Sequence, residues 1–193
     1  MRIIGGRSGG RILKAPKGLA VRPTPDLVKQ AVFNSLGARV VGARVLELFA
    51  GTGALSLECL SRGAAAAVGV EKSPRHAEFV RRNARTAGVP AEALEVRTQD
   101  VFAAIPQLAA AGRQFDLILA DPPYGEKNVG HRSTSLAQQL LADVKHFLLT
   151  PHQILLLVLE TFLKLRELAL FFLGSLLPDN EVSDQLFMLF LQV

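Results

Sequence analysis

Five short apolar runs alternate with helical stretches over most of the chain, and this alternation constrains the fold more than any other feature. The apolar runs are 44–49, 65–70, 93–97, 115–120 and 154–160. The intervening stretches predict helices from residue 54 to about 62 and over 74–87, 101–111 and 135–147. Such spacing is typical of a parallel sheet covered by helices on both faces. We therefore predict a doubly wound, mostly parallel α/β fold, with 185–192 as a candidate last strand.

The positive charge is concentrated at the N-terminus. Residues 1–43 hold eight lysines or arginines and one acid, whereas residues 44–144 hold eleven of each sign. A basic segment of this kind favours a polyanionic partner. The alternative is a solvated N-terminus without a partner. We predict two parts. Residues 1–43 form a basic arm that includes one helix, and residues 44–193 form a catalytic α/β domain. Within the arm we expect two short strands or an extended segment, then a helix from 24 to 37.

Cysteine, histidine and leader patterns narrow the class further. Cys59 is the single cysteine, which excludes an internal disulfide framework and a cysteine-based zinc site. The four histidines form no cluster with metal-ligand spacing, so we expect no metal. The first ten residues lack the apolar core of a secretory signal, and no uncharged run is long enough for a membrane span. We expect a soluble, cytoplasmic protein, with Cys59 in the core.

Candidate functional groups fall at the ends of the predicted strands, where doubly wound sheets bind their ligands. Gly51 and Gly53 form a tight turn after the first strand, which lets a ligand approach the backbone. Glu71 follows the second strand and suits the two hydroxyls of a ribose. Asp100 follows the third, where it either holds an adenine amino group or caps a loop. A bland turn and a solvated acid are the alternatives for the first two groups.

The sequence Asp-Pro-Pro-Tyr follows the fourth strand, at 121–124. Two prolines fix the backbone and remove two N–H donors, so the turn presents carbonyl acceptors. The carboxylate of Asp121 and the carbonyl of Pro122 suit the hydrogens of a planar exocyclic amine. Tyr124, the only tyrosine, suits stacking on the ring that bears the amine. A plain proline-rich turn is the weaker interpretation.

These motifs resemble those of known enzymes. The segment 45–55 is similar to motif I of the class I S-adenosylmethionine-dependent methyltransferases, and 121–124 resembles motif IV in its amino-group form. The opening residues 1–6, Gly10-Arg11, Leu13-Lys14 and 22–34 resemble the bacterial 16S rRNA guanine-N2 methyltransferase family, as does 60–64. The resemblance covers residues 1 to about 160. It implies a Rossmann-like sheet of seven strands, and it implies S-adenosylmethionine as cofactor.

The resemblance also implies a role for each candidate residue. Catalysis would depend on Asp121, Pro122 and Tyr124, acting on a guanine flipped out of the RNA. The cofactor would contact Glu47, Phe49, Gly51, Gly53, Glu71, Asp100 and Val101. RNA phosphates would contact Arg2, Arg7, Arg11, Lys14 and Arg22. The expected partner is 16S rRNA within an assembled or assembling small subunit, bound by a monomer without membrane contact.

Two departures and three rival functions accompany this interpretation. Glu47 occupies a position where the family usually has Asp. From about residue 145 the chain becomes rich in Leu and Phe, and beyond Thr161 the resemblance fades. An altered reading of the sequence would explain both changes, which do not indicate a second domain. The Asp-Pro-Pro-Tyr motif also serves DNA adenine-N6 and cytosine-N4 methyltransferases. An NAD-dependent oxidoreductase is disfavoured by Ser56, and a non-catalytic RNA-binding module by the two intact candidate sites.

Overall fold

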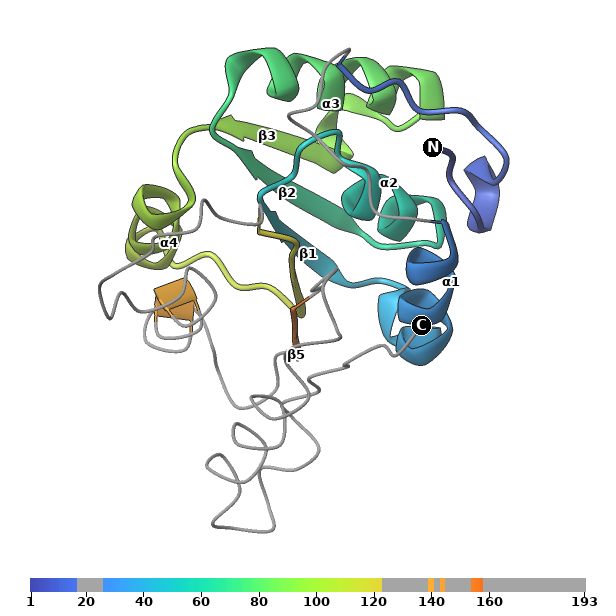
Figure 1. The fold of residues 1–193 in the computed structure, drawn as a ribbon. Helices are drawn as coiled ribbons and strands as arrows, with labels where there is room; N and C mark the ends of the chain where they lie inside the picture. Colours follow the sequence, from blue (N-terminus) through green and yellow to red (C-terminus); the bar gives the residue numbers. More distant parts are fainter. Residues whose placement is uncertain (17–25, 123–138, 141–142, 145–153, 158–193) are drawn as a thin grey trace, which may run out of the picture.

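The computed structural model describes residues 1–16, 26–122, 139–140, 143–144 and 154–157. Within them lie five strands, β1 Arg44–Leu48, β2 Ala66–Glu71, β3 Leu94–Thr98, β4 Leu117–Ala120 and β5 Ile154–Leu157. The α-helices are α1 Asp26–Leu36, α2 Ala54–Ser61, α3 Pro74–Ala87 and α4 Val101–Ala110, and three short 3₁₀ helices are η1 Gly6–Ser8, η2 Gly37–Val40 and η3 Ala91–Ala93. Figure 1 shows their arrangement.

The strands form one parallel sheet in the order β3-β2-β1-β4-β5. From β1 the chain winds outward through β2 to β3, then returns across the sheet to β4. The strand order therefore reverses between β1 and β4, and the crevice at such a switch point is where sheets of this kind bind ligands. The parallel α/β sheet predicted from the alternating pattern is confirmed, as is the Rossmann-like class that the resemblance implied.

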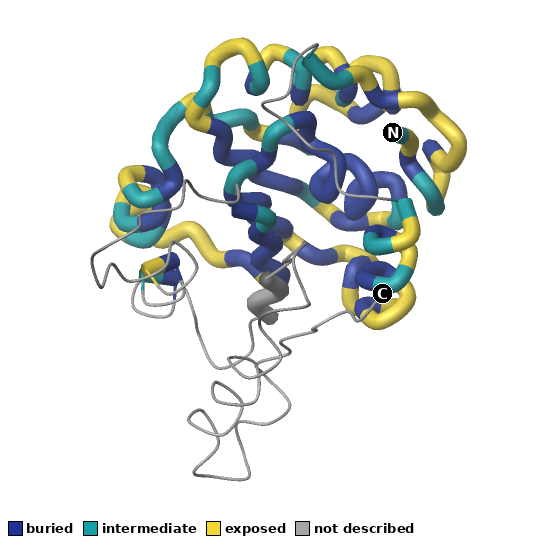
Figure 2. Tube along the Cα trace, in the orientation of Figure 1, coloured by how far each residue is buried: buried dark blue, intermediate teal, exposed yellow. Residues whose placement is uncertain are grey.

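Helices cover both faces of the sheet. On one face, α2 and α3 pack against β1, β2 and β3; on the other, α4 packs against β2. Successive strand residues alternate between the two cores, as Leu117 and Leu119 lie with α2 and Ile118 and Ala120 with α4. Figure 2 shows β1, β2, β4 and α2 mostly buried, while the outer side of α3 is exposed. Burial on both faces explains why these three strands are mostly apolar in sequence.

The helix ends follow the predicted capping pattern. Ser73 accepts a hydrogen bond from the amide of His76 (3.4 Å), ahead of Pro74 at the first helical position of α3. Gly88 ends this helix in the left-handed region, with φ 69°. Residues 139–140 and 143–144 are helical, within the helix predicted for 135–147. The predicted cap at Thr24 and the strand 185–192 lie outside the described residues.

One strand is shorter than predicted. β4 starts at Leu117, two residues later than the strand predicted for 115–120. The side chain of Asp116 accepts hydrogen bonds from the backbone amide of Arg44 (2.8 Å) and from its guanidinium (3.0 and 3.1 Å). At the entry to β4, the backbone amide of Asp116 still donates to the carbonyl of Arg44 (2.8 Å), while the amide of Arg44 is bound by the Asp116 side chain.

The N-terminal residues form a short hairpin. Arg2 and Ile12 make an antiparallel bridge, flanked by hydrogen bonds from Ile3 and Leu13 amides to the facing carbonyls (both 3.0 Å). Ile3 and Leu13 are buried in the core on the face of the sheet that α2 covers. The structure thus shows two short paired segments rather than a free extended arm. No helix in the described part of the chain is long and apolar enough to cross a membrane.

Candidate functional site

The ends of β1, β2 and β3 are joined by hydrogen bonds at the carboxyl edge of the sheet. Glu71 accepts from the amides of Gly51 and Ser73 (both 2.8 Å), and its backbone carbonyl accepts from Gln99 (3.1 Å). Lys72 pairs with Asp100 at 3.1 Å. The structure therefore brings the predicted ribose and adenine residues, Glu71 and Asp100, to the same edge as the glycine turn.

Glu47 lies beneath this edge and holds the start of α2. It is 3% exposed, and its carboxylate accepts from the amides of Leu55 (3.2 Å) and Ser56 (3.0 Å). These are two of the amides that a helix leaves unpaired in its first turn. The N-cap position itself is Gly53, which has no side chain to satisfy them. Glu47 thus orders the turn from within the sheet, and its predicted contact with the cofactor stays a prediction.

Burial raises the pKa of Glu47 to about 7, with a smaller contribution from the negative charge of Asp121, while the amides of Ser56 and Leu55 act in the opposite direction. The ends of β1 and β4 are neighbours in the sheet, because Leu48 pairs with Ala120 and Asp121 follows directly. The two strands on either side of the switch point therefore contribute neighbouring carboxyl groups.

We expect the stability of the protein to fall as the pH rises from about 4.5 to 7. In this window Glu47 ionises when the chain unfolds but stays protonated in the folded state, so unfolding releases a proton. The loss amounts to about 3 kcal/mol. Thermal unfolding followed from pH 4 to 8 should show it, and Glu47→Gln should remove it. A Gln variant with the wild-type pH profile would contradict the assignment.

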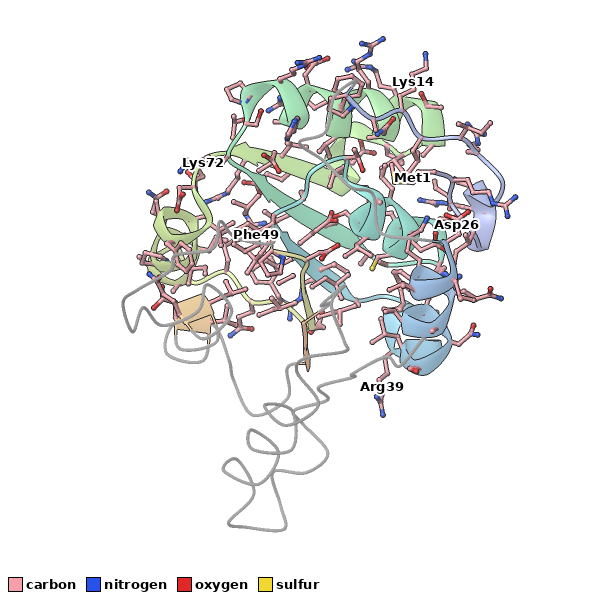
Figure 3. The ribbon with its side chains drawn as sticks, viewed as in Figure 1. Met1, Lys14, Asp26, Arg39, Phe49 and Lys72 are labelled. Atoms are coloured by element: carbon pink, nitrogen blue, oxygen red, sulfur yellow. The ribbon has the colours of Figure 1, made fainter. Side chains whose placement is uncertain are left out.

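Phe49 marks the point where β1 ends. It is the one non-glycine residue with positive φ (61°) among the described residues. This conformation is costly for a side chain of its size. Its ring meets that of Phe102 edge to face, with centroids 6.4 Å apart. In Figure 3, Phe49 and Lys72 lie on the same side of the sheet's carboxyl edge. The strained turn and the two rings form an apolar wall beside Glu71 and Asp100.

The two glycines of the turn have different reasons to be glycine. Gly53 has φ 75°, and a Cβ there would lie 2.7 Å from Val80 on α3. Close packing of α2 against α3 therefore requires this glycine, whether or not a ligand approaches. Gly51, with φ 54°, donates its amide to Glu71. Ligand contact at both glycines stays a prediction.

Asp100 caps α4, as the alternative interpretation had it. Its carboxylate accepts from the amide of Phe102 at 2.9 Å and pairs with Lys72, and these contacts keep its pKa below the ordinary value although burial opposes them. Val101, the predicted adenine neighbour, is buried in the core on the α4 side. Next to Asp100, the side-chain amide nitrogen of Gln99 is buried without a hydrogen-bond partner. An unsatisfied buried donor at this position suits a ligand acceptor.

The catalytic candidates are placed in part. Asp121 directly follows β4 and is half-buried, and Pro122 is buried beside it. Both lie at the carboxyl edge, next to the switch point. Tyr124 and Arg22 lie outside the described residues.

Three polar residues that attach the hairpin were missed by sequence reasoning. Glu58, fully buried on α2, accepts from the amides of Ile4 (2.8 Å) and Gly5 (2.9 Å) and from Arg62 (2.8 Å). Ser61 accepts from the amide of Ser8 at 2.9 Å. The available signal was the presence of Glu58 and Ser61 in a helix that is otherwise mostly apolar.

Asn83 on α3 is the third of these residues. Its side chain accepts from the amide of Lys14 (2.8 Å) and donates to the carbonyls of Lys14 (2.9 Å) and Thr52 (3.0 Å). Thr52 is the central residue of the glycine turn, and its hydroxyl lies 3.6 Å from the sulfur of Met1. The N-terminal segment is therefore bonded to the candidate cofactor turn itself.

The basic residues of the hairpin remain exposed despite these attachments. Arg2 pairs with Asp26 at 3.1 Å but is 62% exposed, and Arg7 and Lys14 are exposed. The backbone of Arg2 is also held, because the buried ammonium of Lys29 donates to its carbonyl and pairs with Asp26. His76 lies 3.6 Å from Glu71, and no group of metal-binding side chains occurs in the described segments.

Comparisons with known proteins agree with this architecture. The fold matches that of a hypothetical protein of Thermus thermophilus, with TM-score 0.64 and 32% identity over 78% of this chain and 81% of that one. The fold and the site define a Rossmann-like α/β protein of the methyltransferase class. The chain belongs to the family described as Conserved hypothetical protein 95, which matches residues 1–164.

Two curated relatives are similar over most of the described chain. Identity to YlbH of Bacillus subtilis is 34% over 152 residues, which cover 79% of this chain and 82% of that protein. Identity to the ribosomal RNA small subunit methyltransferase D of Escherichia coli K12 is 37% over 124 residues, covering 64% of this chain and 60% of that protein. The family match ends at residue 164, close to the predicted limit of the resemblance.

Proposed function

We propose that this protein transfers a methyl group from S-adenosylmethionine to the exocyclic N2 amine of a guanine in small-subunit (16S) ribosomal RNA. The observation that carries the proposal is Asp121-Pro122 at the carboxyl end of β4, beside the switch point, in a chain similar to a small-subunit rRNA methyltransferase. A DNA amino-methyltransferase would use the same motif. The similarity to an rRNA enzyme favours RNA, as does the family match, which includes the basic N-terminal segment.

The residues at the edge of the sheet fit the proposed cofactor. Glu71 and Asp100 offer carboxylate oxygens, Gln99 offers an unpartnered amide donor, and Phe49 and Phe102 offer apolar surface. Gly51, Gly53, Val101 and, through its support of the turn, Glu47 complete the proposed set. When bound, S-adenosylmethionine supplies a methyl group on a positively charged sulfonium.

The protein's own contribution is to orient the amine. The carboxylate of Asp121 and the carbonyl of Pro122 accept the two hydrogens of the guanine amine, which fixes the direction of its lone pair. The negative charge of Asp121 also stabilises the positive charge that grows on the nitrogen. Tyr124 stacks on the base, which is flipped from the RNA. Most of the rate enhancement then comes from proximity and orientation.

The proposal includes the finer parts of the architecture. Residues 1–43 serve as the RNA-contacting part, with phosphate contacts from Arg2, Arg7, Arg11, Lys14 and Arg22, and residues 44–193 form the methyltransferase domain. The sheet has seven strands in all. The enzyme acts as a cytoplasmic monomer on an assembled or assembling small subunit, without membrane contact and without a metal.

Methyl transfer from labelled S-adenosylmethionine tests the proposal directly. The purified chain is incubated with unmodified small subunits, free 16S rRNA and duplex DNA, and the labelled nucleoside is identified after digestion. We expect label on N2-methylguanosine from rRNA or subunits. Label on DNA alone, or on another position of the RNA base, would overturn the proposal.

A further inference from the structure

One side of α3 carries a row of side chains that runs the length of the helix. Arg75, Phe79, Arg82 and Thr86 follow one another at steps of four, three and four residues, which places them on one side of an α-helix. Arg75, Arg82 and Thr86 are exposed, and the guanidinium of Arg82 lies 5.7 Å from the centre of the Phe79 ring. These four residues, here called the α3 stripe, extend over about 16 Å.

Helix stability does not account for the positive charge of this stripe. The one acid of α3, Glu78, pairs with Arg81 (4.0 Å) and Arg85 (3.3 Å), which flank the stripe. Within the described residues neither Arg75 nor Arg82 has an ion pair. Arg75 also lies in the first turn, where the helix dipole disfavours a positive charge. The two exposed arginines therefore have no acidic partner in the part of the chain that the structure describes, and the charge of Arg75 opposes the helix dipole.

The stripe continues into the basic hairpin. The guanidinium of Arg11 donates to the carbonyl of Thr86 at 2.5 Å, at the end of α3. Lys14 is held beside the C-terminal half of the helix by Asn83. Figure 3 shows nitrogen-tipped side chains along the outer side of α3 near Lys14. The α3 stripe and the hairpin thus form one continuous basic surface.

We infer that the α3 stripe is an RNA-binding surface, and this inference rests on the proposed function. The stripe contacts phosphates of the substrate RNA in addition to those that the hairpin contacts. A planar guanidinium binds a phosphate through two parallel hydrogen bonds. Stacking of Arg82 on Phe79 holds one guanidinium in place while leaving its donors free. Phosphate contacts of this kind set the position of the RNA without reading its sequence.

The double variant Arg75→Ala, Arg82→Ala of the full chain tests the inference. Affinity for unmodified 16S rRNA is measured over a range of salt concentrations, together with affinity for S-adenosylmethionine and the melting temperature. Removing two phosphate contacts should weaken binding roughly tenfold and reduce the slope of log affinity against log salt by about 1.5. Cofactor affinity and melting temperature should not change, since both side chains are exposed.

Two further variants define the comparison. Arg7→Ala, Arg11→Ala, Lys14→Ala removes the hairpin charges and should weaken RNA binding in the same salt-dependent manner. Arg39→Ala removes an exposed arginine of η2 that is not among the proposed phosphate contacts and lies far from α3 (Figure 3), and it should leave the affinity for RNA unchanged.

The results distinguish a failure of the inference about the α3 stripe from a failure of the proposed function. Unchanged affinity and salt slope in the α3 variant, beside a wild type that methylates rRNA, would overturn the inference alone. An equal loss in Arg39→Ala would also overturn it, because any arginine would then suffice. A wild type without activity on rRNA would instead overturn the proposed function.

Discussion

Replacing Asp121 by Ala is expected to lower the rate of methyl transfer by about 10²- to 10³-fold, the scale of losing one charge-stabilising group. The variant loses the acceptor that orients the amine. It also loses the negative charge that stabilises the nitrogen as this atom accepts the methyl group. Affinity for S-adenosylmethionine should remain, because Glu71, Asp100 and the glycine turn are untouched. Single-turnover kinetics with rRNA and calorimetric titration with cofactor would measure the two effects separately.

Asp116→Ala is the matched control for Asp121→Ala. Asp116 precedes the same strand, at its opposite end, where it pairs with Arg44. Its removal should leave the rate of transfer unchanged. Asp121→Asn keeps one acceptor oxygen but not the charge. Its rate of methyl transfer should lie between the rates of Asp121→Ala and wild type. Full activity in Asp121→Ala would refute the assignment, as would a loss of cofactor affinity equal to the loss in rate.

Replacing Glu58 by Ala is expected to lower the free energy of unfolding by about 3–5 kcal/mol, as when one partner of a buried ion pair is removed. Glu58 is fully buried, and its carboxylate accepts from Ile4, Gly5 and Arg62. The variant leaves two backbone amides and a guanidinium without their acceptor. Urea unfolding would measure the loss, and amide exchange at residues 1–13 should rise with it.

Glu78→Ala is the control for this effect. Glu78 is 53% exposed on α3 and makes only surface ion pairs, so its removal should change the free energy of unfolding by less than about 0.5 kcal/mol. Glu58→Gln, which retains the volume and one acceptor oxygen, should lose less than Ala. A Glu58→Ala variant within about 1 kcal/mol of wild type would show that the hydrogen bonds of Glu58 contribute little to the stability of the protein.

The class of fold and the edge that bears the site were predictable from the sequence. Apolar runs at the spacing of βα units permit few arrangements other than a parallel sheet, and the caps at Ser73 and Gly88 depend on residues within one turn of the chain. The residues that follow each strand must lie at one edge once the strands are parallel. Glu71, Asp100 and Asp121 therefore lie at that edge for a reason that sequence order supplies.

The roles of single side chains were less predictable because they depend on contacts between distant segments. Gly53 is fixed in part by Val80, which is 27 positions away, and Glu47 caps a helix from inside the sheet. Charge counting suggested a basic arm, but the partners of its backbone are Glu58, Ser61 and Asn83. Polar residues on buried helices show that an attachment exists without showing what is attached.

The sequence by itself determined the parallel sheet, the edge that carries the candidate site, and the family, because these follow from local periodicity and from motifs a few residues long. Only the tertiary structure decided that the basic N-terminal segment is a hairpin bonded to the glycine turn through Asn83 and Thr52. It also placed this hairpin alongside the α3 stripe. The physical reason is that a buried hydrogen bond requires a specific partner in space, and nothing in the local pattern of either segment identifies the other.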